Sequence, residues 1–239
     1  MAVDSLWVEP ESNTDSIDWG ALEFHDVFRI YGSGSARTVA LRGLDLRIEN
    51  KEMVAIVGPS GSGKSTALAL AAGLDRPSAG EIRAAGSSLA QIGETALAEY
   101  RAKSVALVFQ ADNLWPELSA HENIATGLRL AGIGDASRRA REALASFGLA
   151  GRERMLPREL SGGEQQRVAI ASAAAREAPL VLADEPTGEL DRANEETVLA
   201  SLAELRDSHD STVVIVTHSE HVADACDRVV ELRDGKVAW

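Results

Sequence analysis

The sequence has few of the residues that mark extracellular, zinc-stabilised or nucleic-acid-binding proteins. Its one cysteine, Cys226, excludes a disulfide within the chain and fits a reducing compartment. Cysteines and histidines do not cluster as a structural zinc site requires. Lys and Arg number 24 against 37 Asp and Glu, which gives a net charge of −13. Because nucleic-acid phosphates are bound by basic surfaces, we expect no nucleic-acid partner.

Long apolar runs are also lacking. The longest candidates, residues 67–73 and 213–216, are far shorter than the roughly 20 residues that cross a bilayer. The N-terminal segment has neither a basic leader nor an apolar stretch, so we expect no secretory signal. These absences predict a cytoplasmic protein that serves a membrane, if at all, through a partner.

The chain divides into an acidic N-terminal segment and one α/β domain. Residues 1–20 carry five acidic and no basic residues, which is typical of a flexible tail. Residues 21–239 are expected to form the domain, with a helical insertion at about 115–165. Apolar alternation and continuous apolar runs predict strands at 22–31, 38–48, 53–57, 81–85, 104–110, 180–183, 212–216, 228–232 and 236–239, with a loop at 32–35. Apolar spacing of helical period predicts helices at 64–74, 95–101, 121–131, 136–147, 162–176 and 195–206.

A glycine-rich segment, GPSGSGKS at 58–65, fits the phosphate-loop pattern G-x-x-x-x-G-K-[ST]. A predicted strand precedes it and a predicted helix follows it, as the pattern requires. Its glycines allow backbone N–H groups to approach phosphates, and the helix N-terminus adds partial positive charge. Lys64 is expected to reach the β- and γ-phosphates, and the Ser65 hydroxyl to bind Mg²⁺. This segment predicts a nucleoside-triphosphate site.

Two acidic residues, Asp184 and Glu185, follow the buried run at 180–183. An acid at the end of a buried strand is where phosphate-loop proteins hold Mg²⁺. Glu185, beside it, is placed to orient or deprotonate a water molecule. The N-K-x-D pattern, by which GTPases recognise guanine, is absent, and its absence disfavours the interpretation of this chain as a GTPase.

The segment LSGGEQQR at 160–167 resembles the signature of the ATP-binding cassette (ABC) family. Further segments resemble the family's other motifs in the expected order: Tyr31, Gln110, PTGELD at 186–191 and His218. The resemblance covers about residues 22–239. It implies a phosphate-loop NTPase core with a RecA-like mixed sheet, an N-terminal antiparallel β subdomain and a helical signature subdomain.

The resemblance also implies an ATPase of two copies arranged head to tail, with two ATP molecules at the interface. The expected catalytic residues are Glu185 as general base with His218, Gln110 and Lys64. The expected Mg²⁺ ligands are Ser65, Gln110 and Asp184. The expected ATP contacts are Tyr31, Gly58, Pro59, Ser60, Gly61, Ser62, Gly63, Lys64, Ser65, Thr66, Gln110, Ser161, Gly162, Gly163, Glu164, Asp191 and His218, of which the signature residues act on the partner copy's ATP.

The finer sequence details resemble the macrolide-exporter and lipoprotein-release subgroup of the family. The resemblance implies a subunit that energises a separate integral membrane permease from the inner face of the membrane. The alternative is a cassette ATPase that regulates a membrane-bound cell-division or cell-wall hydrolase complex without moving cargo.

Several residues depart from the family pattern or allow a second interpretation. Lys51 stands where the family usually has glycine, and Asn50 is the residue expected to take the left-handed turn. Glu189 replaces the usual Asn or Ala, and Ser172 stands where an arginine is common. Cys226 is expected on an apolar helix face, buried and inert.

Some candidate site residues have a structural alternative. Tyr31, the predicted adenine-stacking residue, would instead pack in the core. Gln110 would only form hydrogen bonds at the end of its strand, and His218 would have a purely structural role. The loop at 111–118 carries Leu114, Trp115 and Leu118. These apolar groups either pack under the helical insertion or line a groove for a short helix of the membrane partner.

Overall fold

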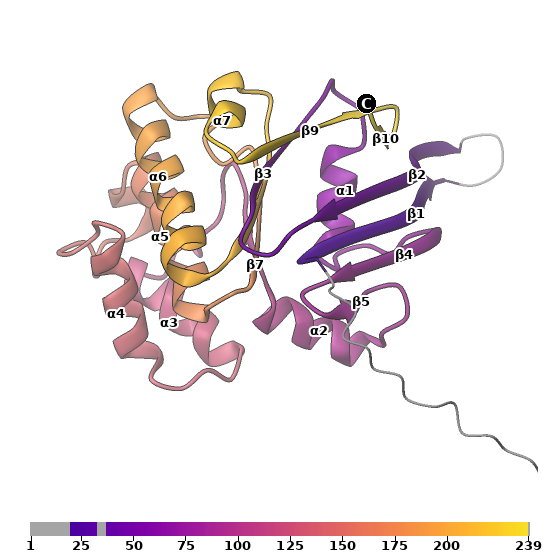
Figure 1. Ribbon diagram of the computed structural model, residues 1–239. Coiled ribbons are helices and arrows are strands. Elements are labelled where there is room, and N and C mark those ends of the chain that lie inside the picture. Colours follow the sequence, from indigo (N-terminus) through magenta and orange to yellow (C-terminus); the bar gives the residue numbers. More distant parts are fainter. Residues whose placement is uncertain (1–19, 33–36, 239) are drawn as a thin grey trace, which may run out of the picture.

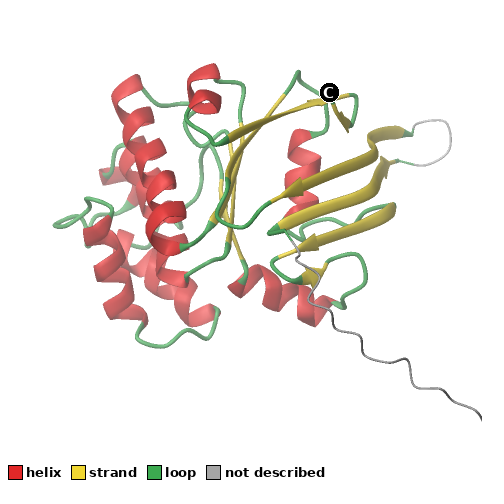
Figure 2. Ribbon diagram, in the orientation of Figure 1, coloured by secondary structure: helices red, strands yellow, loops and turns green. Residues whose placement is uncertain are grey.

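The computed structural model describes residues 20–32 and 37–238. Most of the acidic segment predicted at 1–20 and most of the loop predicted at 32–35 lie outside these residues. Within the described ranges, no helix is both long and apolar enough to cross a bilayer. Figure 2 shows the helices gathered mainly on one side of a central sheet and a second sheet on the other.

The strands form two sheets. The antiparallel sheet has the order β2-β1-β4-β5 and consists of β1 Leu22–Tyr31, β2 Thr38–Ile48, β4 Ala79–Ala84 and β5 Ser87–Ser88. The core sheet has the order β10-β9-β3-β8-β7-β6 and consists of β3 Met53–Val57, β6 Val105–Val108, β7 Leu180–Asp184, β8 Thr212–Val216, β9 Arg228–Arg233 and β10 Lys236–Val237. Only β10 runs antiparallel in the core sheet, which confirms the predicted mixed sheet.

The helices follow the predicted pattern with shifted ends. They are α1 Lys64–Ala71, α2 Glu94–Lys103, α3 Ala120–Leu130, α4 Ala136–Ser146, the 3₁₀ turn η1 Pro157–Glu159, α5 Gly162–Arg176, α6 Arg192–His209 and α7 Glu220–Asp224. Helix α1 ends earlier than predicted, because Gly73 takes a left-handed conformation at φ 63°. The short α7 was not predicted. Cys226 lies beyond its end rather than on a helix face, so that prediction was wrong.

Alternating side chains on the core sheet bury its two faces in two different cores. In β8, Val213 and Ile215 pack with α3–α6, whereas Val214 and Val216 pack with α1 and the antiparallel sheet. Figure 1 shows the same arrangement, with α3–α6 on one side of the core sheet and α1, β1, β2 and β4 on the other. This burial on both faces explains why the strands are continuous apolar runs in the sequence.

The turn before β3 corrects one expectation. Lys51 itself takes the left-handed conformation, with φ 63°, so the prediction that Asn50 would take it was wrong. The Lys51 N–H donates to Thr212 Oγ1 at 2.9 Å, and its ammonium lies 2.6 Å from Asp210 Oδ1. These contacts with the end of α6 and the start of β8 hold a strained residue where glycine would be free of strain.

Candidate functional site

A cavity of about 610 Å³ opens where the phosphate loop meets the ends of β7 and β8 and the start of β2. It brings together most of the residues that the sequence assigned to nucleotide binding. The lining residues are Tyr31, Thr38, Val39, Ala40, Gly58, Ser60, Gly61, Ser62, Gly63, Lys64, Ser65, Thr66, Asp184, Glu185, Val216 and His218.

The phosphate loop is shaped by two glycines that no other residue could replace without a shift of backbone. Gly58 has φ 145°, and a Cβ there would collide with the carbonyl oxygen of Leu232. Gly63, the N-cap of α1, has φ 103°, and a Cβ would lie 2.7 Å from Ala40 O. The loop therefore packs directly against β2 and β9, and α1 begins at the cavity with its N-terminal N–H groups.

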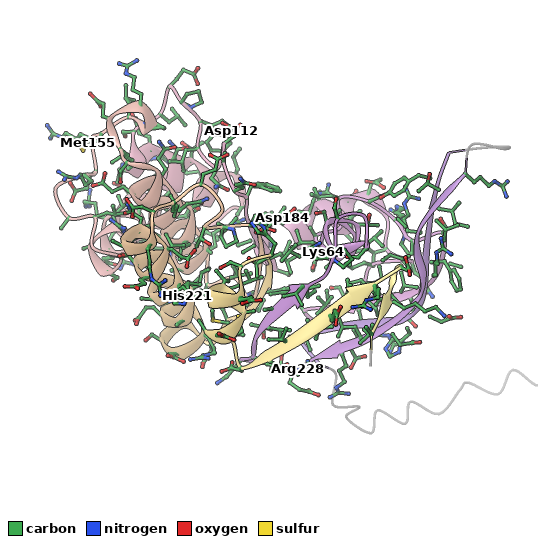
Figure 3. The ribbon with its side chains drawn as sticks, turned by 90° about the horizontal axis from the view of Figure 1, so that it is seen from above. Lys64, Asp112, Met155, Asp184, His221 and Arg228 are labelled. Atoms are coloured by element: carbon green, nitrogen blue, oxygen red, sulfur yellow. The ribbon has the colours of Figure 1, made fainter. Side chains whose placement is uncertain are left out.

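Positive and negative groups face each other in the cavity. Figure 3 shows Lys64 and Asp184 close together between the two halves of the molecule. The Lys64 ammonium donates to Gly58 O at 2.7 Å and Pro59 O at 3.1 Å. Burial and the neighbouring charge of Glu185 raise the pKa of Asp184 against the opposing effects of the Ser65 hydroxyl and Lys64. A cation bound beside Asp184 would relieve this cost.

Glu185 is held in a strained conformation by the end of β8. Its φ is 48°, which is unusual for a residue with a side chain. Its N–H donates to Val216 O at 2.9 Å. Its carboxylate lies 2.8 Å from His218 Nδ1 and accepts from the Thr217 hydroxyl at 3.3 Å. Strain maintained at a cavity wall is typical of a functional residue.

Tyr31 lies at the cavity rim rather than in the core. Its side chain is 38% exposed, which excludes the core-packing alternative. Arg29 lies over the ring at 4.3 Å from the centroid, and the hydroxyl donates to Asp75 Oδ2 at 2.9 Å. These contacts hold one aromatic face in place at the entrance of the cavity.

The signature segment forms the N-terminus of α5 and lies outside the cavity. Ser161 caps the helix by accepting from the Glu164 N–H, and Glu164 accepts from the Ser161 N–H in return. Glu164 also pairs with Arg152 at 2.8 Å, and this hydrogen bond, with that from Ser161, holds the pKa of Glu164 below its ordinary value. Ser161 and Gly162 are exposed, whereas Gly163 is buried against α6.

Gln110 and Asp191 also lie outside the cavity. Gln110 lines a smaller pocket beside Gly162, and its amide donates to Glu189 Oε1 at 3.3 Å. Asp191 caps α6 by accepting from the Asn194 N–H at 2.9 Å. One chain therefore holds the phosphate-loop cavity and the signature segment apart, and we name these two regions the phosphate-loop half-site and the signature half-site.

Comparison with known proteins identifies the family. The sequence model of the ABC transporter family matches residues 41–188. The lipoprotein-releasing system ATP-binding protein LolD of Geobacter metallireducens is 45% identical over 90% of this chain and 97% of its own length. The macrolide export ATP-binding/permease protein MacB of Hyphomonas neptunium is 43% identical, and the chain covers 34% of it. The dimeric structure of the cassette MJ0796 in a post-hydrolysis state, bound to ADP and Pi, superposes with a TM-score of 0.82 at 37% identity, over 91% of this chain and 97% of that one.

The chain belongs to the ABC transporter family. It is an ATP-binding and ATP-hydrolysing subunit with the P-loop NTPase fold of that family. The predicted family and fold class are thereby confirmed.

Sequence reasoning missed several residues that shape the ABC ATPase cavity. Thr38, Val39 and Ala40 line it from β2, where Tyr31 and Thr38 stand opposite each other in the sheet. Thr217, the residue before His218, was not among the predicted site residues, although its hydroxyl contacts Glu185. None of these residues belongs to a spaced motif. Their only sequence signal is that they flank predicted loops at strand ends.

Proposed function

We propose that ATP closes two copies of this chain head to tail and that hydrolysis reopens them, driving a separate membrane subunit. The observation that carries this proposal is the separation of the two half-sites. Ser161 and Gly162 lie exposed at the N-terminus of α5, outside the cavity that Lys64 lines. The N-terminus of α5 from a second copy would supply N–H groups to the γ-phosphate from the open side. A two-fold arrangement would complete both sites at once.

Within each site the residues have distinct roles. The loop N–H groups and Lys64 bind the phosphates, and Tyr31 stacks on the adenine. Glu185 takes a proton from the attacking water, and its position is fixed by Thr217 and His218. Because Nδ1 of His218 is engaged by Glu185, Nε2 is the ring nitrogen that contacts the γ-phosphate. Gln110 must leave Glu189 to reach the site, which would link the site to the loop at 111–118.

The oxygen donors at the cavity fit Mg²⁺. The Ser65 hydroxyl and the Asp184 carboxylate are hard ligands, and burial raises the pKa of Asp184, a cost that a bound cation would offset. Bound Mg²⁺ would neutralise phosphate charge. Gln110 would join these ligands only after the side-chain movement described above.

The membrane partner is proposed to dock beside the loop at 111–118. Trp115 is 46% exposed there, whereas Leu114 packs against the helical core. Each predicted alternative therefore fits one residue of the loop: Leu114 packs under the helical insertion, whereas Trp115 is available for contact with a partner. An apolar contact of this kind suits a short amphipathic helix of a permease, which would hold the chain on the inner face of the membrane. The names of the relatives, lipoprotein release and macrolide export, favour transport over the regulatory alternative.

Glu185→Gln tests the reaction. The change removes the base and preserves the shape of the side chain, so hydrolysis is expected to fall at least about a hundredfold while ATP binding is retained. The variant should accumulate as an ATP-bound dimer in gel filtration. Glu142→Gln, the same change on the exposed face of α4 and outside the cavity, is the control. Hydrolysis by the Glu185 variant at the wild-type rate would contradict the assignment.

A further inference from the structure

The end of β1 is tied to the segment that follows α1 by several short contacts. The Ser78 N–H donates to Phe28 O at 2.8 Å, and the Ile30 N–H donates to Ser78 Oγ at 3.0 Å. Arg29, which lies between these two strand residues, donates from Nε to Asp75 Oδ2 at 2.8 Å, and its Nη2 lies 2.7 Å from Asp75 Oδ1. A two-point pair of this kind fixes the orientation of both planar groups. The fold therefore sets the position of the Arg29 guanidinium.

This pair supports the ring of Tyr31. The Arg29 guanidinium lies 4.3 Å from the ring centroid, and the Tyr31 hydroxyl donates to Asp75 Oδ2 at 2.9 Å, the same oxygen that Arg29 Nε contacts. The ring is thus held at one face and at its tip. Tyr31 still lines the cavity and is partly exposed, so the ring retains surface that a ligand can cover. Arg29 and Asp75 are both largely buried, and burial strengthens their mutual attraction relative to an exposed pair.

Helix α1 connects this support to the phosphate loop. Gly63, the N-cap of α1, belongs to the loop that lines the cavity, and Asp75 lies shortly beyond the other end of the helix at Ala71. Figure 1 shows α1 beside the antiparallel sheet, and the buried side chains of the helix pack in the same core as β1 and β2. One packed helix therefore carries the phosphate site at one end and the support of the ring at the other.

We propose that Arg29 and Asp75 are positioning residues for the adenine, which hold Tyr31 as a preformed stacking surface. This inference rests on the stacking of adenine on Tyr31 proposed above. The cation covers one face of the ring, so the base takes the opposite face. The entropy cost of fixing the ring is then met during folding and not during ATP binding. Without Arg29 the ring could turn, and each ATP that binds would have to immobilise it.

A direct electrostatic role for Arg29 is the alternative, in which its charge attracts the phosphates. Asp75 opposes that role, because its carboxylate neutralises the guanidinium at 2.7 Å. Among the residues that the structure describes, Arg29 is also not one that lines the cavity. The two roles predict different ligand dependence. Loss of a positioning residue weakens only ligands that carry the base, whereas loss of an attracting charge also weakens inorganic triphosphate.

Isothermal titration calorimetry of the full chain with ATP and with inorganic triphosphate separates these roles. Arg29→Met keeps an unbranched stem and removes the charge. We expect its Kd for ATP to rise about two- to fivefold and its Kd for inorganic triphosphate to stay unchanged. Arg29→Lys, which retains a cation near the ring, should regain part of the ATP affinity. Arg83→Met is the matched control, because Arg83 pairs with Glu81 at 2.6 Å on the neighbouring strand β4 and is similarly buried; both affinities should stay unchanged.

A second variant weakens the same support from its other side. Asp75→Asn keeps the shape of the side chain and an acceptor oxygen but loses the charge that holds Arg29. The ratio of ATP affinity to inorganic triphosphate affinity should fall in this variant as well. Taking the ratio removes any general effect of the altered charge on phosphate binding. An unchanged ratio in both Arg29→Met and Asp75→Asn would overturn the inference.

The sharpest comparison repeats Arg29→Met in a chain that lacks the ring. In the Tyr31→Ala background the second change should leave ATP affinity unaltered, because no ring remains to be held. A loss of ATP affinity by the same factor in both backgrounds would show a general structural effect and overturn the inference. An equal loss of affinity for inorganic triphosphate would also overturn it, in favour of the electrostatic role. Wild-type ATP affinity in Tyr31→Ala alone would instead refute the proposed stacking, and the inference would fall with it.

Discussion

The phosphate-loop half-site and the signature half-site differ in how much of their function one chain can supply. Lys64 lies in a cavity whose walls come from both sheets and α1, so the phosphates meet a prepared surface. Ser161 lies on an exposed helix end whose capping contacts all lie within its own segment. In the proposed mechanism the first half-site binds a ligand alone, whereas the second only completes a site that another copy provides. Binding and hydrolysis should therefore be separable by mutation.

The largest expected effect comes from placing a charge on the signature half-site without unfolding it. Aspartate and asparagine are both good N-caps, so Ser161→Asp and Ser161→Asn should retain α5 and differ only in charge. The Asp variant should bind ATP at its own phosphate loop but repel the partner's γ-phosphate. We expect steady-state hydrolysis at least about a hundredfold below that of the Asn variant. Equal rates in the two variants would show that this helix end does not meet phosphate.

A smaller effect is expected from the adenine side of the phosphate-loop half-site. Tyr31→Ala removes the exposed ring but no cavity wall near Lys64. ATP affinity should fall by about 1–2 kcal/mol, the usual scale for loss of a base-stacking aromatic. Isothermal titration calorimetry on the isolated chain measures this, with Tyr31→Phe as the control that retains the ring. Unchanged affinity in the Ala variant would place the adenine elsewhere.

The smallest effect concerns the stability of the nucleotide-free chain. A raised pKa means that the ionised Asp184 is disfavoured in the folded state, so the wild type loses stability as pH rises through that pKa. Asp184→Asn should therefore melt at a higher temperature than the wild type at pH 7, and the difference should shrink as pH is lowered. Saturating Mg-ATP should reverse the order, because only the wild type gains from the metal. If the Asp184→Asn variant without ligand melted at a lower temperature than the wild type, ionised Asp184 would not destabilise the folded chain, and the prediction would be contradicted.

The parts of the molecule that the sequence predicted are those with local signals. Helix α5 has its predicted bounds, because Ser161 and Glu164 form a capping box and the helix ends with Glu177 in the left-handed conformation. The hairpin of β9 and β10 follows from Asp234-Gly235, whose φ angles of 51° and 77° suit a tight turn. The strand–loop–helix around Lys64 is equally local.

The parts that could not be predicted depend on contacts between distant segments. The contact of Gln110 with Glu189 joins two loops that are far apart in the sequence. The position of Arg176 beside the loop at 111–118 depends on how that loop packs against α3 and α5. Neither property has a spacing pattern in the sequence. The start of α6 at Arg192 could have been found, since Asp191 caps it.

The most direct test of the two half-sites is to mix two inactive variants. Lys64→Met disables the phosphate loop and retains the signature, whereas Ser161→Asp does the reverse. A head-to-tail pair of one copy of each contains one intact composite site. Random pairing should therefore restore about a quarter of the wild-type hydrolysis rate in an equal mixture. Recovery of that size is predicted if ATP is hydrolysed between copies. A mixture as inactive as either variant alone would show that each site is completed within a single chain.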